Sequence, residues 1–169
     1  MKYLLSLLSV VVLLSACKKK EGGCDATAGD TTASAQEEKM VTDYIAANGI
    51  TGAVELDSSG LYYVIETPGN SKKPGFCSTV AVKYVGRLTN GTIFDQTTGT
   101  NTAVFSLVGL IESWQRTIPL LGEGGKIKLI VPPALGYRDQ GSFNPNTGQY
   151  TIPPNAVLIF DIELVIVRS

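Results

Sequence analysis

The most constraining feature of the sequence is a segment near its end in which apolar and polar residues alternate. Between residues 157 and 167, Asp161 and Glu163 stand between apolar neighbours. Because successive side chains of a β-strand point to opposite faces, this period of two predicts a strand with one buried face, as is typical of an antiparallel sheet. The expected buried face carries Leu158, Phe160, Ile162, Leu164 and Ile166.

Three earlier segments also have strand patterns. Residues 79–88 alternate with a period of two, and Asn90-Gly91, which follows them, is the strongest short signal for a hairpin turn. Residues 126–131 form a third strand pattern, which Pro132-Pro133 ends, and residues 61–65 form a fourth. The sequence therefore predicts a sheet of at least four strands.

Helical spacing appears in two places. Between residues 110 and 121 it predicts a short amphipathic helix lying on the sheet, and Pro119 should tighten or end its last turn. Residues 35–48 predict a short connecting helix that Asn48-Gly49 ends. Together, these elements predict an α+β fold, in which a twisted antiparallel β-sheet is wrapped around one short α-helix.

Composition narrows the chemistry that is available. The chain of 169 residues contains no histidine, which excludes Ser-His-Asp and Cys-His catalysis, histidine-bound zinc and an imidazole base. Lys and Arg number 14 against 15 Asp and Glu, and Lys18-Lys19-Lys20 is the only basic run. Nucleic-acid binding requires a concentrated positive face, so no nucleic acid is expected as a partner.

The first residues have the pattern of an export signal. The 13 residues 4–16 are almost entirely apolar or small, but they are too few to span about 30 Å of hydrocarbon as a helix. Their ending, Leu14-Ser15-Ala16-Cys17, resembles the bacterial lipobox, after which the cysteine is diacylated and becomes the new N-terminus. The alternative is an ordinary cleavage site followed by a chance cysteine. Two or more acyl chains hold a protein stably on a bilayer, so Cys17 is the expected lipidation site.

The remaining chain divides by composition. We expect residues 1–16 to be a lipoprotein signal peptide, 17–36 a flexible tether, 37–55 a short connecting helix and 56–169 one β-rich domain. Export would place Cys24 and Cys77 where disulfides persist, so these two cysteines form either a bridge or two free thiols.

Five segments within residues 56–169 resemble, in the same order, those of FKBP-type peptidyl-prolyl isomerases, and in particular the Mip-like bacterial branch. The strength of the resemblance lies in this order, since any one segment alone would be weak. The segments are Val80-x-Val82-x-Tyr84-x-Gly86-x-Leu88-x-x-Gly91-x-x-Phe94-Asp95, Phe105-x-Leu107, Leu110-Ile111-x-x-Trp114, Pro132-Pro133-Ala134-Leu135-Gly136-Tyr137 and Ile152-Pro153-Pro154-Asn155-Ala156-x-Leu158-x-Phe160.

The resemblance implies an apolar pocket between the sheet and the short helix. Trp114 would form its floor, Asp95 would sit at its rim, and Tyr137 would offer a hydroxyl to a carbonyl beside the substrate proline. Ile152 would offer its backbone N–H to the other carbonyl. The substrate-binding walls would be Tyr84, Phe94, Phe105, Leu110, Ile111 and Phe160. Taken singly, these aromatic residues could equally be ordinary core residues.

Some positions depart from the family pattern. Ser113 and Arg138 stand where the family usually has glycine, and Arg138 would be strained if that position needs a positive φ. Glu112 adds a charge that is expected at the edge of the pocket. The loop of residues 138–151 is longer than in minimal members, and is either a flap over the site or a solvated insertion.

The resemblance further implies an isomerase (rotamase) that turns X-Pro bonds and assists the folding of exported proteins, with no cofactor or metal. Its partners would be proline-containing polypeptides and macrolide inhibitors of the family. The expected location is the cell envelope, on the periplasmic side of the outer membrane, where the protein would be a lipid-anchored monomer. Two alternatives remain: a chaperone module that binds proline peptides with little or no turnover, and a structural lipoprotein.

Overall fold

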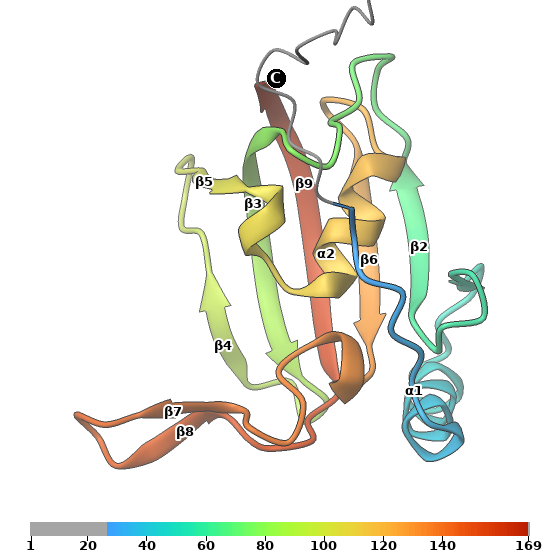
Figure 1. The fold of residues 1–169 in the computed structure, drawn as a ribbon, viewed down its shortest axis with the longest axis vertical. Helices are drawn as coiled ribbons and strands as arrows, with labels where there is room; N and C mark the ends of the chain where they lie inside the picture. The colour runs from blue at the N-terminus through green and yellow to red at the C-terminus, as the bar shows by residue number, and fades with distance from the viewer. Residues whose placement is uncertain (1–26, 169) are drawn as a thin grey trace, which may run out of the picture.

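The computed structural model describes residues 27–168, and its main feature is a seven-stranded antiparallel sheet (Figure 1). The strand order is β1-β2-β6-β9-β3-β4, and β5 pairs with β3 beside β4. The strands are β1 (Val54–Glu55), β2 (Tyr62–Thr67), β3 (Thr79–Leu88), β4 (Ile93–Gln96), β5 (Ala103–Ser106), β6 (Lys126–Val131) and β9 (Leu158–Arg168). The long central strand β9 lies between β6 and β3, so the last segment of the chain completes the sheet.

The strongly patterned strands are confirmed. The bounds of β3 and β6 coincide with the predicted ones, and β2 and β9 are shifted by only one or two residues. The turn at Asn90-Gly91 connects β3 to β4, with Gly91 at a φ of 85°. The short strands β1, β4 and β5 were not predicted, because segments of two to four residues are too short to show a period.

One residue of the predicted buried face points the other way. Ile166 is 39% exposed, whereas the next residue, Val167, is buried. The pairing between β3 and β9 shifts there, because Ala81 lies opposite Ile166 while Val82 lies opposite Leu164. The extra residue in β9 is a β-bulge, which reverses the faces beyond it. The expectation that Ile166 is buried is therefore wrong.

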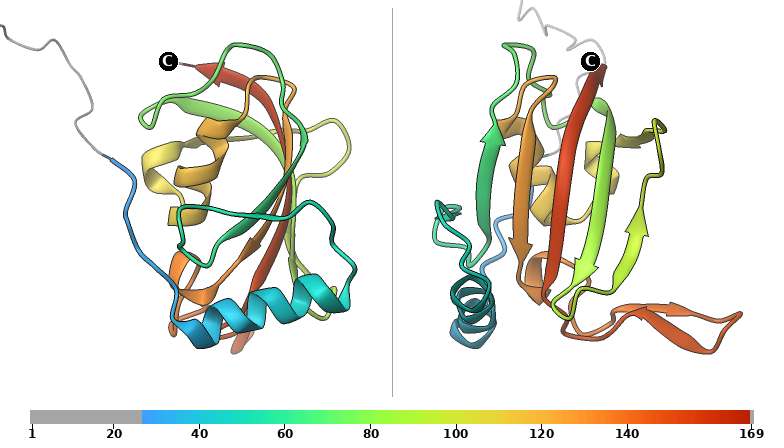
Figure 2. Two further views of the ribbon diagram at one scale, coloured as in Figure 1. Left: turned by 90° about the vertical axis from the view of Figure 1, so that its right-hand side faces the viewer. Right: turned by 180° about the vertical axis from the view of Figure 1, so that it is seen from behind.

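The short helix α2 (Glu112–Thr117) lies in the hollow of the curved sheet (Figures 1 and 2). It is preceded by the 3-10 turn η1 (Leu107–Gly109) and continues into a second, η2 (Ile118–Leu120), in which Pro119 tightens the last turn as predicted. Trp114 and Ile118 from this region pack into the main core against β3, β6 and β9. The fold is thus the predicted α+β sheet wrapped around one short helix.

The N-terminal helix α1 (Ala35–Ala47) runs across the lower end of the sheet, beside the ends of β2 and β6 (Figure 2). A capping box starts it, in which the Ser34 N–H donates to the Glu37 carboxylate at 2.8 Å and the Ser34 hydroxyl accepts from the Glu37 N–H. Val41 packs with Ile130 and Val157 in a second, smaller core. The helix begins where the helical pattern of residues 35–48 begins, and it packs against the domain.

The predicted long loop contains a β-hairpin, formed by β7 (Ser142–Asn144) and β8 (Gln149–Ile152). It projects from one end of the body (Figures 1 and 2). A 3-10 turn, η3 (Pro133–Leu135), leads into this region from β6.

The signal peptide, the lipidation site and one of the two predicted disulfide cysteines were expected near the N-terminus. The signal peptide 1–16, Cys17 and Cys24 lie outside the described residues, so the lipidation site and the pairing of Cys24 stay predictions. Cys77 is disulfide-bonded. Among residues 27–168, no helix is long and apolar enough to cross a membrane.

Candidate active site

Aromatic rings surround Trp114 on the inner face of α2. The indole is 4% exposed, and its centroid lies 5.2 Å from that of Tyr84, 5.3 Å from Phe160 and 6.0 Å from Phe105. All three rings stand nearly perpendicular to the indole, with interplanar angles of 85°. Edge-to-face contacts of this kind fix the orientation of the rings and leave the face of the indole as a flat floor.

A cavity of about 290 Å³ opens above this floor. Eight of the ten predicted pocket residues line it, from β3, β4, β5, β9, α2, the link between η1 and α2, and the loop after η3. The lining is Tyr84, Asp95, Phe105, Gly109, Leu110, Ile111, Trp114, Tyr137 and Phe160. Segments between residues 84 and 160 thus converge on one mostly apolar cavity, which has the size and character of a binding site for a small group.

The rim of the cavity is polar. The Tyr84 hydroxyl donates a hydrogen bond of 2.5 Å to the carboxylate of Asp95, the only ionised side chain in the lining. Burial raises the pKa of Tyr84, and the hydrogen bond to Asp95 and its negative charge raise it further. Burial and the charge of Asp95 also raise the pKa of Tyr137. Both phenols therefore keep their protons at neutral pH. The Tyr84 proton is donated to Asp95, so Tyr137 is the phenol whose O–H can be donated to a ligand.

The loop that carries Tyr137 has the strain that the sequence suggested. Arg138 has a φ of 55°, in the left-handed region where a side chain costs about 1–2 kcal/mol. Two backbone hydrogen bonds hold it there: its N–H donates to Pro133 O at 2.9 Å, and its carbonyl accepts from Asn155 N at 2.8 Å. Tyr137 still reaches the cavity, and it is 37% exposed.

Two predicted residues do not line the cavity. Phe94 packs against Phe160 from behind, at 5.6 Å between ring centroids. This contact needs a glycine at position 86, because a Cβ there would lie 2.6 Å from the Phe94 ring. The Ile152 side chain is buried at the end of β8, so only its backbone N–H is a candidate for contacting a ligand. Gly109 in η1 lines the cavity and was missed, because a residue without a side chain carries no chemical signal.

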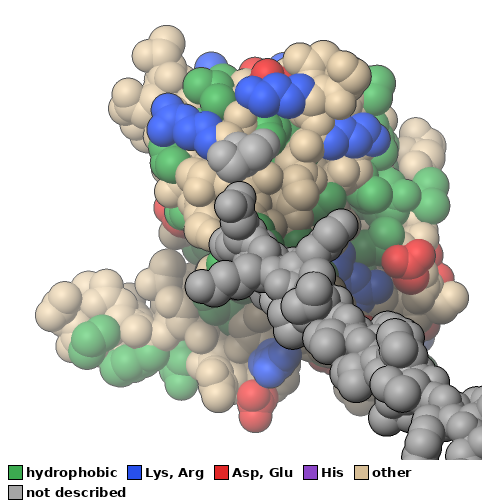
Figure 3. Space-filling model, turned by 45° about the horizontal axis from the view of Figure 1, so that its top comes forward, with side chains coloured by type: hydrophobic (Ala, Val, Ile, Leu, Met, Phe, Trp, Pro, Cys, Tyr) green, Lys and Arg blue, Asp and Glu red, His purple; other side chains and the backbone are tan. Residues whose placement is uncertain are grey.

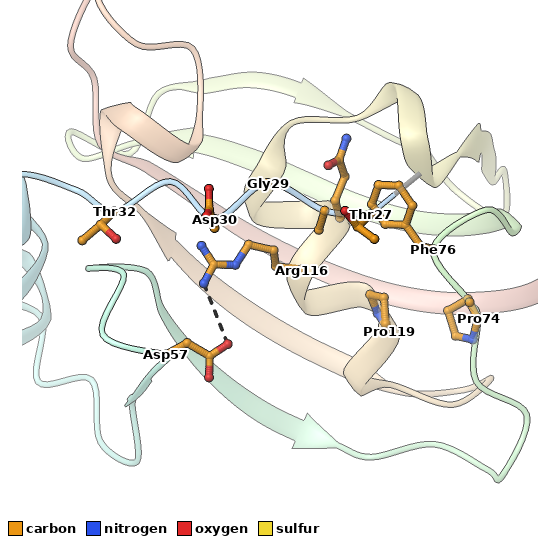
Figure 4. A pocket seen from close by; sticks show the side chains of 12 residues that line it. Thr27, Gly29, Asp30, Thr32, Asp57, Pro74, Phe76, Arg116 and Pro119 are labelled. Atoms are coloured by element: carbon orange, nitrogen blue, oxygen red, sulfur yellow. Dashed lines mark ion pairs between the residues drawn. The ribbon is translucent and has the colours of Figure 1, made fainter. Parts of the chain in front are cut away.

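Glu112, which was expected at the edge of the pocket, faces the other way. Its carboxylate accepts a 2.8 Å hydrogen bond from Thr31 N and lies 3.6 Å from the Arg116 guanidinium. Arg116 in turn donates to Thr31 O at 3.0 Å and lies 3.8 Å from Asp57. Figure 4 shows Arg116 between the N-terminal segment and Asp57, in a second cavity of about 650 Å³. The helix therefore presents Trp114 to one cavity and Arg116 to another.

The fold and the cavity define a class of protein: a curved antiparallel sheet around a short helix, with an aromatic pocket between them. Residues 70–165 match the family model described as FKBP-type peptidyl-prolyl cis-trans isomerase. The chain belongs to this family.

Relatives agree with this assignment. The FKBP-type peptidyl-prolyl cis-trans isomerase FkpA of Aeromonas hydrophila is 35% identical over 79% of this chain and 48% of its own length. The outer membrane protein MIP of Legionella longbeachae is 34% identical over 80% of this chain and 56% of its own length. The chain thus spans about half the length of these two curated relatives.

Solved structures show the same fold. A peptidyl-prolyl cis-trans isomerase from Pseudomonas syringae matches with a TM-score of 0.66 and 30% identity, covering 83% of this chain and all of that one. FkpA from Escherichia coli matches with a TM-score of 0.65 and 34% identity, over 79% of this chain and 60% of its own.

Proposed function

We propose that this protein is a peptidyl-prolyl cis-trans isomerase that turns X-Pro bonds of exported polypeptides in the cavity over Trp114. The observation that carries the proposal is the combination of an aromatic floor with protonated phenols at the rim of one cavity of about 290 Å³. Trp114 would lie under the proline ring, between Tyr84, Phe105 and Phe160.

This chemistry suits a protein without histidine. The barrier to rotation about an amide is about 18–20 kcal/mol and arises from resonance across the C–N bond. X-Pro bonds interconvert in tens to hundreds of seconds, although both isomers are well populated in unfolded chains. Rotation breaks no covalent bond, so it needs no nucleophile, acid–base pair or metal.

The pocket would act by favouring the twisted amide over the planar one. Water stabilises the charge-separated planar form, and the aromatic walls exclude that water. The Tyr137 hydroxyl and the Ile152 N–H would then hold the carbonyls on either side of the proline. Donors that are fixed in advance stabilise the transition state without reorganisation. Asp95 would orient the Tyr84 hydroxyl at the rim through their 2.5 Å hydrogen bond.

The decisive test is the isomerisation of a short proline peptide, with and without a macrolide that fills FKBP pockets. We expect catalysis that the macrolide blocks, and its loss in Asp95→Ala. Macrolide binding without catalysis would favour the alternative, a chaperone module that holds proline peptides with little turnover. Neither binding nor catalysis would favour a structural lipoprotein and would refute the site.

We further propose that Cys17 carries the lipid anchor and that the residues after it form a tether to the domain, in the order that the sequence pattern indicates. This tether is shorter than the expected range 17–36, because Thr31 is hydrogen-bonded to Glu112 and Arg116 and α1 begins at Ala35. Anchoring would keep the isomerase in the cell envelope, on the periplasmic side of the outer membrane, as a monomer. In cells, Cys17→Ser should release the protein from the membrane fraction and abolish incorporation of labelled palmitate. If the variant still bound the membrane fraction and still incorporated palmitate, Cys17 would not be the anchor.

We also propose that Cys24 is the partner of Cys77, which would tie the tether to the domain. Cys77 is disulfide-bonded and lies two residues before the start of β3. A non-reducing peptide map should contain a fragment joining the two cysteines. A map that joins Cys77 to any other residue would exclude the pairing.

A further inference from the structure

The β7–β8 hairpin is a regular, hydrogen-bonded element. Its strands pair antiparallel, with Ser142 opposite Ile152 and Asn144 opposite Gln149. The turn is closed by hydrogen bonds from Gly148 N to Asn144 O and from Asn146 N to Asn144 Oδ1, both 2.9 Å. An isolated two-stranded hairpin is only marginally stable, so contact with another polypeptide would stabilise it.

The hairpin carries an exposed pair of aromatic side chains. Phe143 and Tyr150 lie opposite each other across the two strands, with ring centroids 5.2 Å apart. Phe143 is 54% exposed and Tyr150 is 50% exposed. Figure 3 shows hydrophobic side chains on this projecting part of the molecule. An edge-to-face pair that is half in solvent presents a rigid apolar surface at little cost in side-chain entropy.

The base of the hairpin is fixed to the candidate active site. Tyr137 lines the cavity, and its carbonyl accepts a 3.0 Å hydrogen bond from Gly141 N just before β7. At the other end, β8 finishes at the buried Ile152. The strands approach so closely here that a Cβ on Gly141 would lie 2.4 Å from Ile152 O. The direction of the hairpin is therefore set relative to the cavity.

The chemistry of the hairpin suits a polypeptide of varied sequence. Residues 142–151 contain no charged side chain and consist of two aromatic residues with Ser, Thr, Asn, Gln, Gly and Pro. Antibody loops use a similar mixture, in which aromatic residues supply contact area and small amides and hydroxyls supply adaptable hydrogen bonds. Without charges, the hairpin would select apolar segments and be indifferent to their net charge.

We propose that Phe143 and Tyr150 bind the client polypeptide beside the proline, so that the site favours long unfolded chains over short peptides. This inference rests on the proposed isomerase function. The aromatic pair is two residues along β8 from Ile152, about 7 Å at 3.3 Å per residue. An extended chain with its proline over Trp114 would reach the pair within about three to five residues.

The test compares two substrates in one variant. Phe143→Ser with Tyr150→Ser should leave kcat/KM for a proline tetrapeptide within about twofold, because the tetrapeptide is too short to reach the pair. For a denatured protein whose refolding waits on an X-Pro bond, kcat/KM should fall about 5–10-fold, mainly through KM. The loss should be the same at low and high salt, since no ion pair is involved.

The matched control is Val54→Ser, which removes an equally exposed apolar side chain (53%) at the far edge of the sheet, in β1. This variant should leave kcat/KM unchanged for both substrates. The single variant Tyr150→Ser should show a smaller loss in the same direction, which guards against a folding defect in the double variant. Equal changes for both substrates, or no change for the protein substrate, would overturn the inference.

Failure of the proposed function would look different. In that case the wild-type protein would not turn over the tetrapeptide. The hairpin would then be tested by the binding of a fluorescently labelled, proline-free unfolded polypeptide, which the double variant should bind about 5–10-fold more weakly. Equal binding by wild type and variant would overturn the inference independently.

Discussion

The two faces of helix α2 differ in how completely their polar groups are satisfied. On the outer face, Glu112 and Arg116 hold both the N–H and the carbonyl of Thr31, and contact each other. On the inner face, the Trp114 indole N–H is buried and has no hydrogen-bond partner among residues 27–168. The polar groups of the outer face hold the N-terminal segment to the domain, whereas the inner face presents an aromatic surface to the cavity.

This division teaches that stability and function are separable within one six-residue helix. Substitutions on the outer face should change the free energy of unfolding and leave the cavity intact, because their contacts run to the N-terminal segment. Substitutions on the inner face should change both properties, because Trp114 belongs to the core and to the cavity lining.

The largest effect is expected from Trp114→Ala. Removing the floor should lower kcat/KM for a proline peptide by at least about 100-fold, equivalent to about 2.7 kcal/mol of transition-state stabilisation. The cavity it leaves should also lower the free energy of unfolding by about 3–5 kcal/mol. Peptide isomerisation and urea unfolding, measured below the unfolding transition, check the two effects.

Trp114→Phe is the matched control, because it keeps an aromatic surface and should retain much of the stability. A folded Trp114→Ala protein with wild-type turnover would show that the inner face is only core.

Arg116→Met tests the outer face and should have the next largest effect. The Arg116 and Glu112 side chains are only 11% and 12% exposed, so losing the guanidinium leaves a carboxylate buried without its partner. We expect a loss of about 2–4 kcal/mol in the free energy of unfolding. Turnover of a proline peptide should stay within about twofold, because Arg116 does not line the cavity over Trp114.

Adding Glu112→Gln to Arg116→Met should recover part of the loss, since it removes the unpaired charge. A large drop in turnover in a stable Arg116→Met protein would show that the two faces are coupled.

The sequence predicted the strands and the pocket better than the direction of individual side chains. Alternation in β3 and β6 is a local signal, so their bounds were right. The bulge that turns Ile166 outward depends on pairing with β3, which no local pattern records. Similarly, Glu112 was misplaced because its partner, Thr31, is 81 residues away in the chain.

The hairpin shows the same limit. Residues 142–152 hold the turn residues Asn, Pro and Gly, but strands of three and four residues are too short to show an alternation. Only the structure shows that Phe143 and Tyr150 are paired and that Phe94 supports Phe160 from behind.

A smaller effect is expected from Ser113→Ala on the same helix. The Ser113 hydroxyl is completely buried and has no partner in the described part of the chain. Removing it ends the cost of burying an unsatisfied group and improves helix propensity, so the free energy of unfolding should rise by about 1 kcal/mol.

Thr117→Val provides the contrasting control, because the Thr117 hydroxyl donates a 2.7 Å hydrogen bond to Ser113 O. This variant should lose about 0.5–1.5 kcal/mol. If the two substitutions changed the free energy of unfolding equally in urea, the hydrogen bond of the Thr117 hydroxyl would not account for the difference expected between them.

The smallest effect concerns alkaline pH and the rim of the pocket. The pKa of Tyr84 is raised by burial and by Asp95, so between about pH 10 and the raised value the unfolded chain loses a proton that the folded protein keeps. The unfolded state then binds fewer protons, so stability falls as pH rises through this window. Tyr84→Phe removes the ionisable group. The free energy of unfolding in urea should therefore fall less steeply between about pH 9 and 11 than in wild type. Solvent screening of the partly exposed ring keeps the difference small, and an unchanged slope would mean that the pKa of Tyr84 is not raised in the folded protein.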